Sequence, residues 1–109
     1  MCKQKKIVYL AGPITGVPDY QSRFRVIETA LALKGYTVLN PAKLPEGLTN
    51  KQYMHVCLAL IDCADVVLFL DGSQDSKGAM CEFTYCRCIG KPHVFKLEEL
   101  ERIERRKKP

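Results

Sequence analysis

A serine and a glutamate six residues apart, Ser76 and Glu82, carry the clearest chemical potential in this sequence. Ser76 is placed to cap a helix over residues 77–89, and the free N–H groups and positive dipole end of such a terminus bind anions. Glu82 falls in the second turn, on a mostly apolar helix face that it shares with Gly78, Ala79, Tyr85, Cys86 and Ile89. Burial there would raise the pKa of the carboxyl, and the helix terminus would lower it. Two interpretations stay open: a reactive carboxylate beside an anion site, or a glutamate whose tip reaches solvent.

The segment GPITG over residues 12–16 is a second loop with unusual chemistry. It has neither the dinucleotide-binding pattern nor the lysine of a phosphate-binding loop. Its two glycines still permit close approach of the main chain to a ligand. Tyr9 lies three residues before Gly12, and its hydroxyl can hydrogen-bond Glu82 and orient it. A plain tight turn and an ordinary core tyrosine are the alternative interpretations.

Alternating strands and helices must position these side chains. Apolar, β-rich runs predict four strands, over residues 6–11, 36–39, 65–70 and 92–95. Apolar residues at helical spacing predict four helices, over residues 19–34, 49–64, 77–89 and from residue 97. Thr49 and Gln52 have the spacing of a capping box at the start of the second helix.

The alternation of strand and helix predicts a single α/β domain over residues 1–109, with an open parallel sheet of four to five strands. The run over residues 65–70 is apolar on both faces, as in a sheet covered by helices on both sides. Ligands of such sheets bind at the carboxyl ends of the strands. The loops over residues 12–16 and 71–78 leave those ends, so function is expected there.

Composition and charge exclude several classes of protein. The chain has 109 residues, of which 47% are hydrophobic and 27% charged, unlike a disordered or fibrous protein. No apolar run approaches the roughly 20 residues that span a bilayer, and no leader is visible, so we expect a cytoplasmic protein without a membrane partner. Residues 102–109 form a basic tail that accounts for four of the five net positive charges. No aromatic residues interleave with these charges, so a solvated helix end is favoured and a nucleic-acid partner is not expected.

The cysteines predict free thiols rather than a metal or redox site. None of the six is spaced as C-x-x-C, and the two histidines lie far apart in the sequence. We therefore expect no metal and no cofactor, and we expect the cysteines to act as small core residues. They are Cys2, Cys57, Cys63, Cys81, Cys86 and Cys88.

Four segments, in this order and spacing, resemble the nucleoside 2-deoxyribosyltransferase-like family. They are YLAGPITG at 9–16, ADVV at 64–67, S-x-G-x-x-x-E at 76–82 and IGKP at 89–92. The resemblance covers about residues 5–95 and is strongest to a small bacterial and phage branch, which is related to deoxynucleoside 5′-monophosphate N-glycosidases. It implies a flavodoxin-like or Rossmann-like three-layer sandwich. It also implies cleavage or transfer at the N-glycosidic bond of a (deoxy)nucleoside or its 5′-monophosphate, without a cofactor.

The resemblance also implies roles for individual residues. Glu82 matches the nucleophile that attacks C1′, and Tyr9 matches the tyrosine that positions it. Ser76 stands where nucleoside-using transferases tend to have an acidic residue, and a serine there is found in nucleotide-using hydrolases. A 5′-monophosphate is therefore favoured, because an acidic side chain would repel it. The implied substrate-binding residues are Gly12, Ile14, Thr15, Gly16, Ser76 and Gly78.

Cys57 departs from the family pattern. It occupies the position of a second carboxylate, eight residues before Asp65, and a thiol cannot replace an acid that protonates the leaving base. Asp71 at a strand end is the favoured substitute, ahead of Asp62 and Asp75. The departure leaves an alternative open, a non-catalytic nucleotide-binding module on the same fold. Because relatives often complete the pocket from a neighbouring subunit, a homo-oligomer, either dimer or tetramer, is expected.

Overall fold

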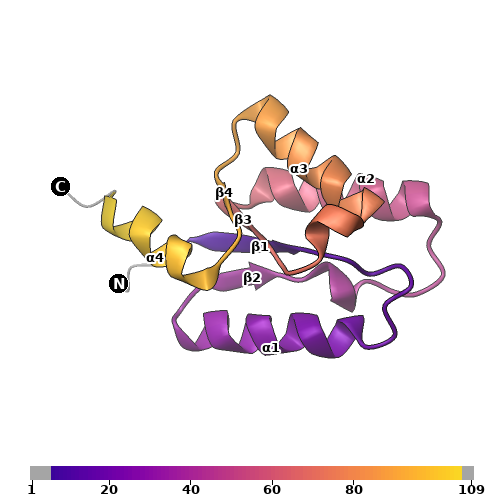
Figure 1. Cartoon of the computed structure of the whole chain (residues 1–109), viewed down its shortest axis with the longest axis horizontal. Helices are drawn as coiled ribbons and strands as arrows, with labels where there is room; N and C mark the ends of the chain where they lie inside the picture. Colours follow the sequence, from indigo (N-terminus) through magenta and orange to yellow (C-terminus); the bar gives the residue numbers. More distant parts are fainter. Residues whose placement is uncertain (1–5, 107–109) are drawn as a thin grey trace.

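The structure, a computed structural model, describes residues 6–106 of the chain. Strands and helices alternate along it (Figure 1). In chain order they are β1 (Ile7–Ala11), α1 (Tyr20–Leu33), β2 (Thr37–Leu39), the short 3₁₀ helix η1 (Pro41–Lys43), α2 (Asn50–Cys63), β3 (Val66–Phe69), the 3₁₀ helix η2 (Ser73–Asp75), α3 (Lys77–Ile89), β4 (His93–Val94) and α4 (Leu97–Arg106).

The four strands form one parallel sheet in the order β2-β1-β3-β4. Tyr9 on the central strand β1 pairs with Leu39 of β2 and with Val67 of β3. Helix α1 lies on one side of the sheet, and α2 and α3 lie on the other (Figure 1). The predicted α/β sandwich is confirmed, with four strands in the described residues.

Each face of the sheet packs its own apolar core. Alternate residues of β1 point to opposite sides, so Val8 and Leu10 pack with α1 and α4, and Tyr9 and Ala11 pack with α2 and α3. All four residues of β3 are buried, as the sequence predicts for a strand covered on both sides.

Local signals in the sequence fix where the helices begin. The Thr49 hydroxyl accepts the Gln52 N–H at 3.1 Å, and the Gln52 side chain accepts the Thr49 N–H at 2.9 Å, so the predicted capping box is present. Ser76 caps α3 by accepting the Ala79 N–H at 3.2 Å. Both predicted helix starts are therefore confirmed, and the second of them fixes the position of Glu82.

The cysteines only partly follow the sequence-based expectation. Cys57 and Cys86 are buried, but Cys63, Cys81 and Cys88 are exposed, so their assignment to the core is wrong. On α3 the buried residues recur at 79, 82 and 86, and Cys81 and Cys88 fall between them on other sides of the helix. Cys2 lies outside the described residues.

Two further features concern the whole described chain. Within residues 6–106, no helix is long and apolar enough to cross a membrane, and no group of three or more His, Cys, Asp or Glu residues could hold a metal ion. The predicted basic tail is described only as far as residue 106, where α4 ends.

Candidate active site

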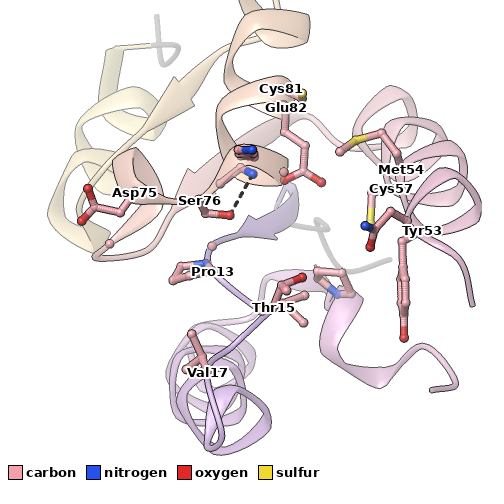
Figure 2. Close-up of a pocket in the computed structure, with 18 of the residues that line it drawn as sticks. Pro13, Thr15, Val17, Tyr53, Met54, Cys57, Asp75, Ser76, Cys81 and Glu82 are labelled. Carbon is pink, nitrogen blue, oxygen red and sulfur yellow. Dashed lines mark hydrogen bonds between the residues drawn. The ribbon is translucent and has the colours of Figure 1, made fainter. Parts of the chain in front are cut away.

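A cavity of about 900 Å³ opens at the carboxyl ends of β1 and β3, on the side of the sheet covered by α2 and α3. Its walls come from the loop after β1, the first turns of α2 and the N-terminus of α3 (Figure 2). This is the edge where the sequence places a ligand site, because parallel strands bring their following loops together there.

Glu82 and Tyr9 meet at the back of this cavity. The Tyr9 hydroxyl donates a 2.7 Å hydrogen bond to Glu82 Oε2, joining residues that are 73 positions apart in the chain. Glu82 is 6% exposed and Tyr9 is fully buried. The predicted contact is confirmed, and the alternative of a glutamate whose tip lies in solvent is wrong.

The environment of Glu82 changes how readily it loses its proton. Burial raises the pKa of this carboxyl from 4.5 to about 7, against the opposing hydrogen bonds from the Tyr9 hydroxyl and the Cys57 thiol. Burial, reinforced by the neighbouring Glu82 charge, raises the pKa of Tyr9 well above its usual value, so the phenol stays neutral. The site thus holds one carboxyl that titrates near neutrality and a tyrosine that keeps it in place.

Cys57 lies on α2, facing the same pair. Its thiol is buried, and burial raises its pKa to about 11, so it is neutral at pH 7. Cys57, Met54 and Tyr53 form the wall of the cavity that faces the Glu82 carboxyl (Figure 2). The position where the family resemblance implies a second acid therefore lies inside the cavity and carries no charge.

The N-terminus of α3 forms the opposite wall. Ser76 and Gly78 line the cavity, and helix geometry leaves N–H groups of the first turn without acceptors inside the helix. Lys77 and Lys51 are exposed at the same cavity and add positive charge. This wall is suited to an anionic group of a ligand, since main-chain donors, the helix dipole and the Lys77 cation lie on it.

The comparisons with known proteins concern the family and the fold. The model of the family described as "Domain of unknown function (DUF4406)" matches residues 6–95. The chain belongs to the DUF4406 family. No protein of curated function matches the sequence. Among solved structures, the DUF4406 chain is similar to one titled "2-desoxiribosyltransferase from Leishmania mexicana", with a TM-score of 0.68 and 18% identity.

That similarity confirms the expected relationship in fold. It covers 84% of the DUF4406 chain and 63% of the other chain, so this chain spans less than two thirds of the protein it matches. Sequence identity is too low for the match to assign an activity, and the roles of individual residues stay predictions.

Most of the predicted substrate-binding residues line the cavity of the DUF4406 domain. Gly12, Ile14, Thr15, Ser76 and Gly78 are among its lining residues. Gly16 does not line the cavity. It is exposed, and its φ of +79° is the left-handed conformation that the turn at the end of the loop over residues 12–16 requires.

Asp71 is misplaced in the sequence-based prediction. It is exposed and lines a separate hollow of about 440 Å³ with Phe24 and Ile27 of α1, away from Glu82. The chain turns at Gly72, which has a φ of +88°, so Asp71 faces the α1 side before Asp75 and Ser76 return to the main cavity. Asp62 is also elsewhere, where its carboxylate accepts a 2.6 Å hydrogen bond from the Tyr85 hydroxyl.

Apart from Cys57, the wall from α2 is the part of the site that sequence reasoning missed. Asn50, Tyr53, Met54 and Cys57 all line the cavity, and their spacing of three and four residues places them on one helix face. The sequence contains this signal, but an apolar stripe at that spacing is equally typical of a helix that packs on the core. Tyr53 is fixed further by donating a 2.7 Å hydrogen bond to the Pro45 carbonyl.

The two loops at the mouth of the cavity are packed against each other. A Cβ atom built on Gly72 would lie 3.3 Å from Pro13 Cγ, tighter than an ordinary contact. A Cβ atom on Gly12 would lie 3.1 Å from Leu70 Cβ and 3.2 Å from Phe24 Cζ. Glycine at both positions therefore permits the close approach that shapes this edge of the site.

Proposed function

We propose that this DUF4406 domain cleaves or transfers the N-glycosidic bond of a (deoxy)nucleoside or its 5′-monophosphate, with Glu82 as the nucleophile. The observation that carries the proposal is a buried carboxylate, held by the Tyr9 hydroxyl at 2.7 Å, at the back of a cavity of about 900 Å³. The cavity has room for a nucleotide. A solved structure titled as a 2-desoxiribosyltransferase shares the fold, which supports the same class of chemistry.

The reaction begins when ionised Glu82 attacks C1′ of the sugar. A bond forms between a carboxylate oxygen and C1′, the C1′–N bond breaks, and its electron pair leaves with the base. The transition state has oxocarbenium character, so the negative charge of Glu82 stabilises it. Water then releases the sugar from the glycosyl ester, or a second base accepts it.

The rest of the cavity orients the substrate around that step. A 5′-phosphate would bind at the start of α3, where Ser76 and Gly78 lie beside the exposed cation of Lys77. The base would lie against Tyr53 and Met54 on α2, across the cavity from Ser76 (Figure 2). Ser76 favours a phosphorylated substrate because its own side chain carries no charge that would repel a phosphate.

Free base released from a panel of nucleosides and their 5′-monophosphates tests the proposal. Wild-type protein should release base from at least one member, and Glu82→Gln should release none above background. The exposed Glu98 offers a matched control, since Glu98→Gln makes the same change of charge far from the cavity. Folded wild-type protein without base release from any member would overturn the proposal.

A non-catalytic nucleotide-binding module is the second candidate. The observation that favours it is Cys57, a neutral thiol at the position where the resemblance implies an acid. It predicts that nucleoside monophosphates raise the Tm of the protein while the same samples release no base. Measurable turnover by wild-type protein that is lost in Glu82→Gln would exclude it.

We also propose that the protein is a homo-oligomer in the cytoplasm. Light scattering coupled to size-exclusion chromatography measures the mass directly, against 12.4 kDa for one chain. A dimer or tetramer is the expected result, and a monomer at all concentrations would contradict it.

A further inference from the structure

Within the described residues 6–106 of one chain, the cavity lacks a well-placed group that could give a proton to a departing base. Eight of its lining residues bear ionisable side chains, and among the described residues only two of these are carboxyls. The eight are Tyr9, Lys51, Tyr53, Cys57, Asp75, Lys77, Cys81 and Glu82. Protonation of a leaving group needs an acid with a pKa near the working pH and within hydrogen-bonding reach of the base.

The residues nearest the expected base cannot meet that need. The Tyr9 hydroxyl already donates a hydrogen bond to Glu82, and the Tyr53 hydroxyl donates a 2.7 Å hydrogen bond to the Pro45 carbonyl. Cys57 faces the base region, but its buried thiol has a pKa of about 11 and is a poor acid at neutral pH. None of these three side chains therefore has both the free proton and the pKa that protonation of a departing base requires.

The remaining ionisable side chains are poorly placed. Asp75 and Cys81 are exposed, and Figure 2 shows the Asp75 carboxylate directed away from Glu82, on the side of Ser76. Lys51 and Lys77 are exposed cations at the mouth. Glu82 itself must be ionised when it attacks, so it cannot protonate the base in the same step.

We propose that the preferred substrates are N-glycosides whose base is a cation before cleavage, such as an N7-alkylated purine or a quaternary pyridinium nucleotide. This inference rests on the proposed function. When Glu82 bonds to C1′ of such a substrate, the electron pair of the C1′–N bond moves to the base and cancels its charge. The base leaves as a neutral molecule without receiving a proton. Water then hydrolyses the sugar ester, and its surplus proton passes to solvent.

Two side chains of the cavity, Glu82 and Tyr53, favour a cationic base, although Lys51 on α2 adds a positive charge at the same cavity. Ionised Glu82 attracts it in the bound state, and no second carboxylate competes at Cys57. The Tyr53 ring lines the same region and is fixed in place by its hydroxyl, so its face can receive a cation. Ser76 and the start of α3 remain available for a phosphate at the other end of the ligand.

A matched pair of substrates tests the inference in wild-type protein. 2′-Deoxyguanosine 5′-monophosphate and its N7-methyl derivative differ by one methyl group and one positive charge at the base. Each kcat/KM is divided by the uncatalysed rate for the same compound, so that intrinsic lability cancels. We expect the methylated member to be accelerated at least as much as the parent compound, whereas a site that supplied a general acid would accelerate the parent compound about 100-fold more. Nicotinamide mononucleotide and its reduced form, which has no charge on the ring, provide a second pair.

An acid introduced at position 57 should remove the preference for a cationic base. Cys57→Asp should raise kcat/KM for 2′-deoxyguanosine 5′-monophosphate at least about tenfold and leave the methylated compound unimproved. Cys57→Asn is the matched control, because its side chain has the shape of aspartate and no acidic proton, and it should raise neither value. The wild-type comparison needs no variant, so it decides the matter even if Cys57→Asp fails to fold.

The outcomes separate this inference from the proposed function. A normalised acceleration of the parent compound that exceeds that of its methylated derivative by about the 100-fold that a general acid contributes overturns the inference and leaves Glu82 chemistry standing. Absence of cleavage for every substrate, with folded protein, overturns the proposed function and this inference with it.

Discussion

The two faces of the sheet use the same strands for different purposes. On the α1 side, Val8 and Leu10 of β1 pack into a cluster whose buried residues are almost all aliphatic or aromatic. On the α2 and α3 side, the next residue along the strand, Tyr9, is equally buried but hydrogen-bonds a carboxyl. A shift of one residue along β1 thus separates side chains that stabilise the fold from a side chain that orients Glu82.

This contrast shows that the free-energy effect of burying a side chain depends on whether the side chain is apolar or a carboxyl. Apolar side chains gain free energy when they leave water, and a carboxyl loses it unless it is protonated or paired. Glu82 accepts a hydrogen bond from Tyr9, yet its pKa is still raised to about 7. Both sides therefore supply stability through their apolar cores, but the α2 and α3 side also retains a group that reduces stability when it is ionised.

The largest expected effect is on turnover. Glu82→Gln removes the nucleophile and should lower kcat by at least a factor on the order of 10³. Intact-mass measurement after rapid acid quench should show a sugar adduct on wild-type protein and none on the variant. A Glu82→Gln protein that retains turnover would contradict the assignment of Glu82 as the nucleophile. A Glu98→Gln control that loses turnover would contradict it as well.

Two neighbouring substitutions on β1 should separate stability from function. Leu10→Ala leaves a cavity on the α1 side and should lower the free energy of unfolding by about 3 kcal/mol, with kcat little changed below its Tm. Tyr9→Phe keeps the ring and removes the hydroxyl, so it should cost only about 1 kcal/mol and lower kcat. Denaturant unfolding and initial rates measure the two effects, and the same pattern in both variants would contradict the contrast.

Tyr9→Phe should also change the pH profile. The Tyr9 hydrogen bond lowers the pKa of Glu82, so its loss should move the acidic limb of kcat to higher pH. A purely structural role for Tyr9 would lower activity without moving that limb. Rates measured from pH 5 to 9 distinguish the two.

Stability should fall as the pH rises through the titration of Glu82. The folded-state pKa of about 7 lies above the ordinary value of 4.5, so the folded protein binds the proton more tightly than the unfolded chain does. Its contribution is fully present below about pH 4.5 and is lost as the pH rises through about 7. The whole span is at most about 3 kcal/mol. Glu82→Gln should remove this slope, so the variant should unfold at higher denaturant than wild-type protein at pH 8. Parallel pH curves for the two proteins would contradict this.

The smallest effect concerns two helix caps. Ser76→Ala and Thr49→Ala each remove a capping hydroxyl and should each cost about 1 kcal/mol of stability. Only Ser76 lines the cavity, so only Ser76→Ala should weaken binding of thymidine 5′-monophosphate, by about tenfold. Calorimetry measures the affinities, and equal losses of affinity in the two variants would show that Ser76 acts only as a cap.

The sequence predicts the sheet and its central contact because those depend on local patterns. Strand and helix periods place Tyr9 near the carboxyl end of β1, and the cap at Ser76 sets the phase of α3, so Glu82 must face the sheet. Together these two signals are enough to bring the Tyr9 hydroxyl to Glu82.

The errors lie where direction depends on a loop or on packing between helices. Asp71 lies at a strand end, as the sequence indicates, but the left-handed turn at Gly72 determines which side its carboxylate faces. From the sequence, Tyr53 and Met54 are as typical of core residues as of cavity-lining residues, because the pattern of one helix does not show whether its apolar stripe borders a cavity. Such outcomes follow from tertiary arrangement, which periodicity does not encode.

The contact between Gly72 and Pro13 has a consequence for how such a site can diversify. The loops after β3 and β1 are in close contact there, and a Cβ atom on Gly72 would lie only 3.3 Å from Pro13 Cγ. An alanine at that position would have to push Pro13 outward and adopt an unfavourable backbone angle. A single methyl group would thus shift the Pro13 loop by a few tenths of an ångström while leaving Glu82, Tyr9 and Cys57 untouched. The edge of the cavity can therefore be altered at a residue that takes no part in the chemistry.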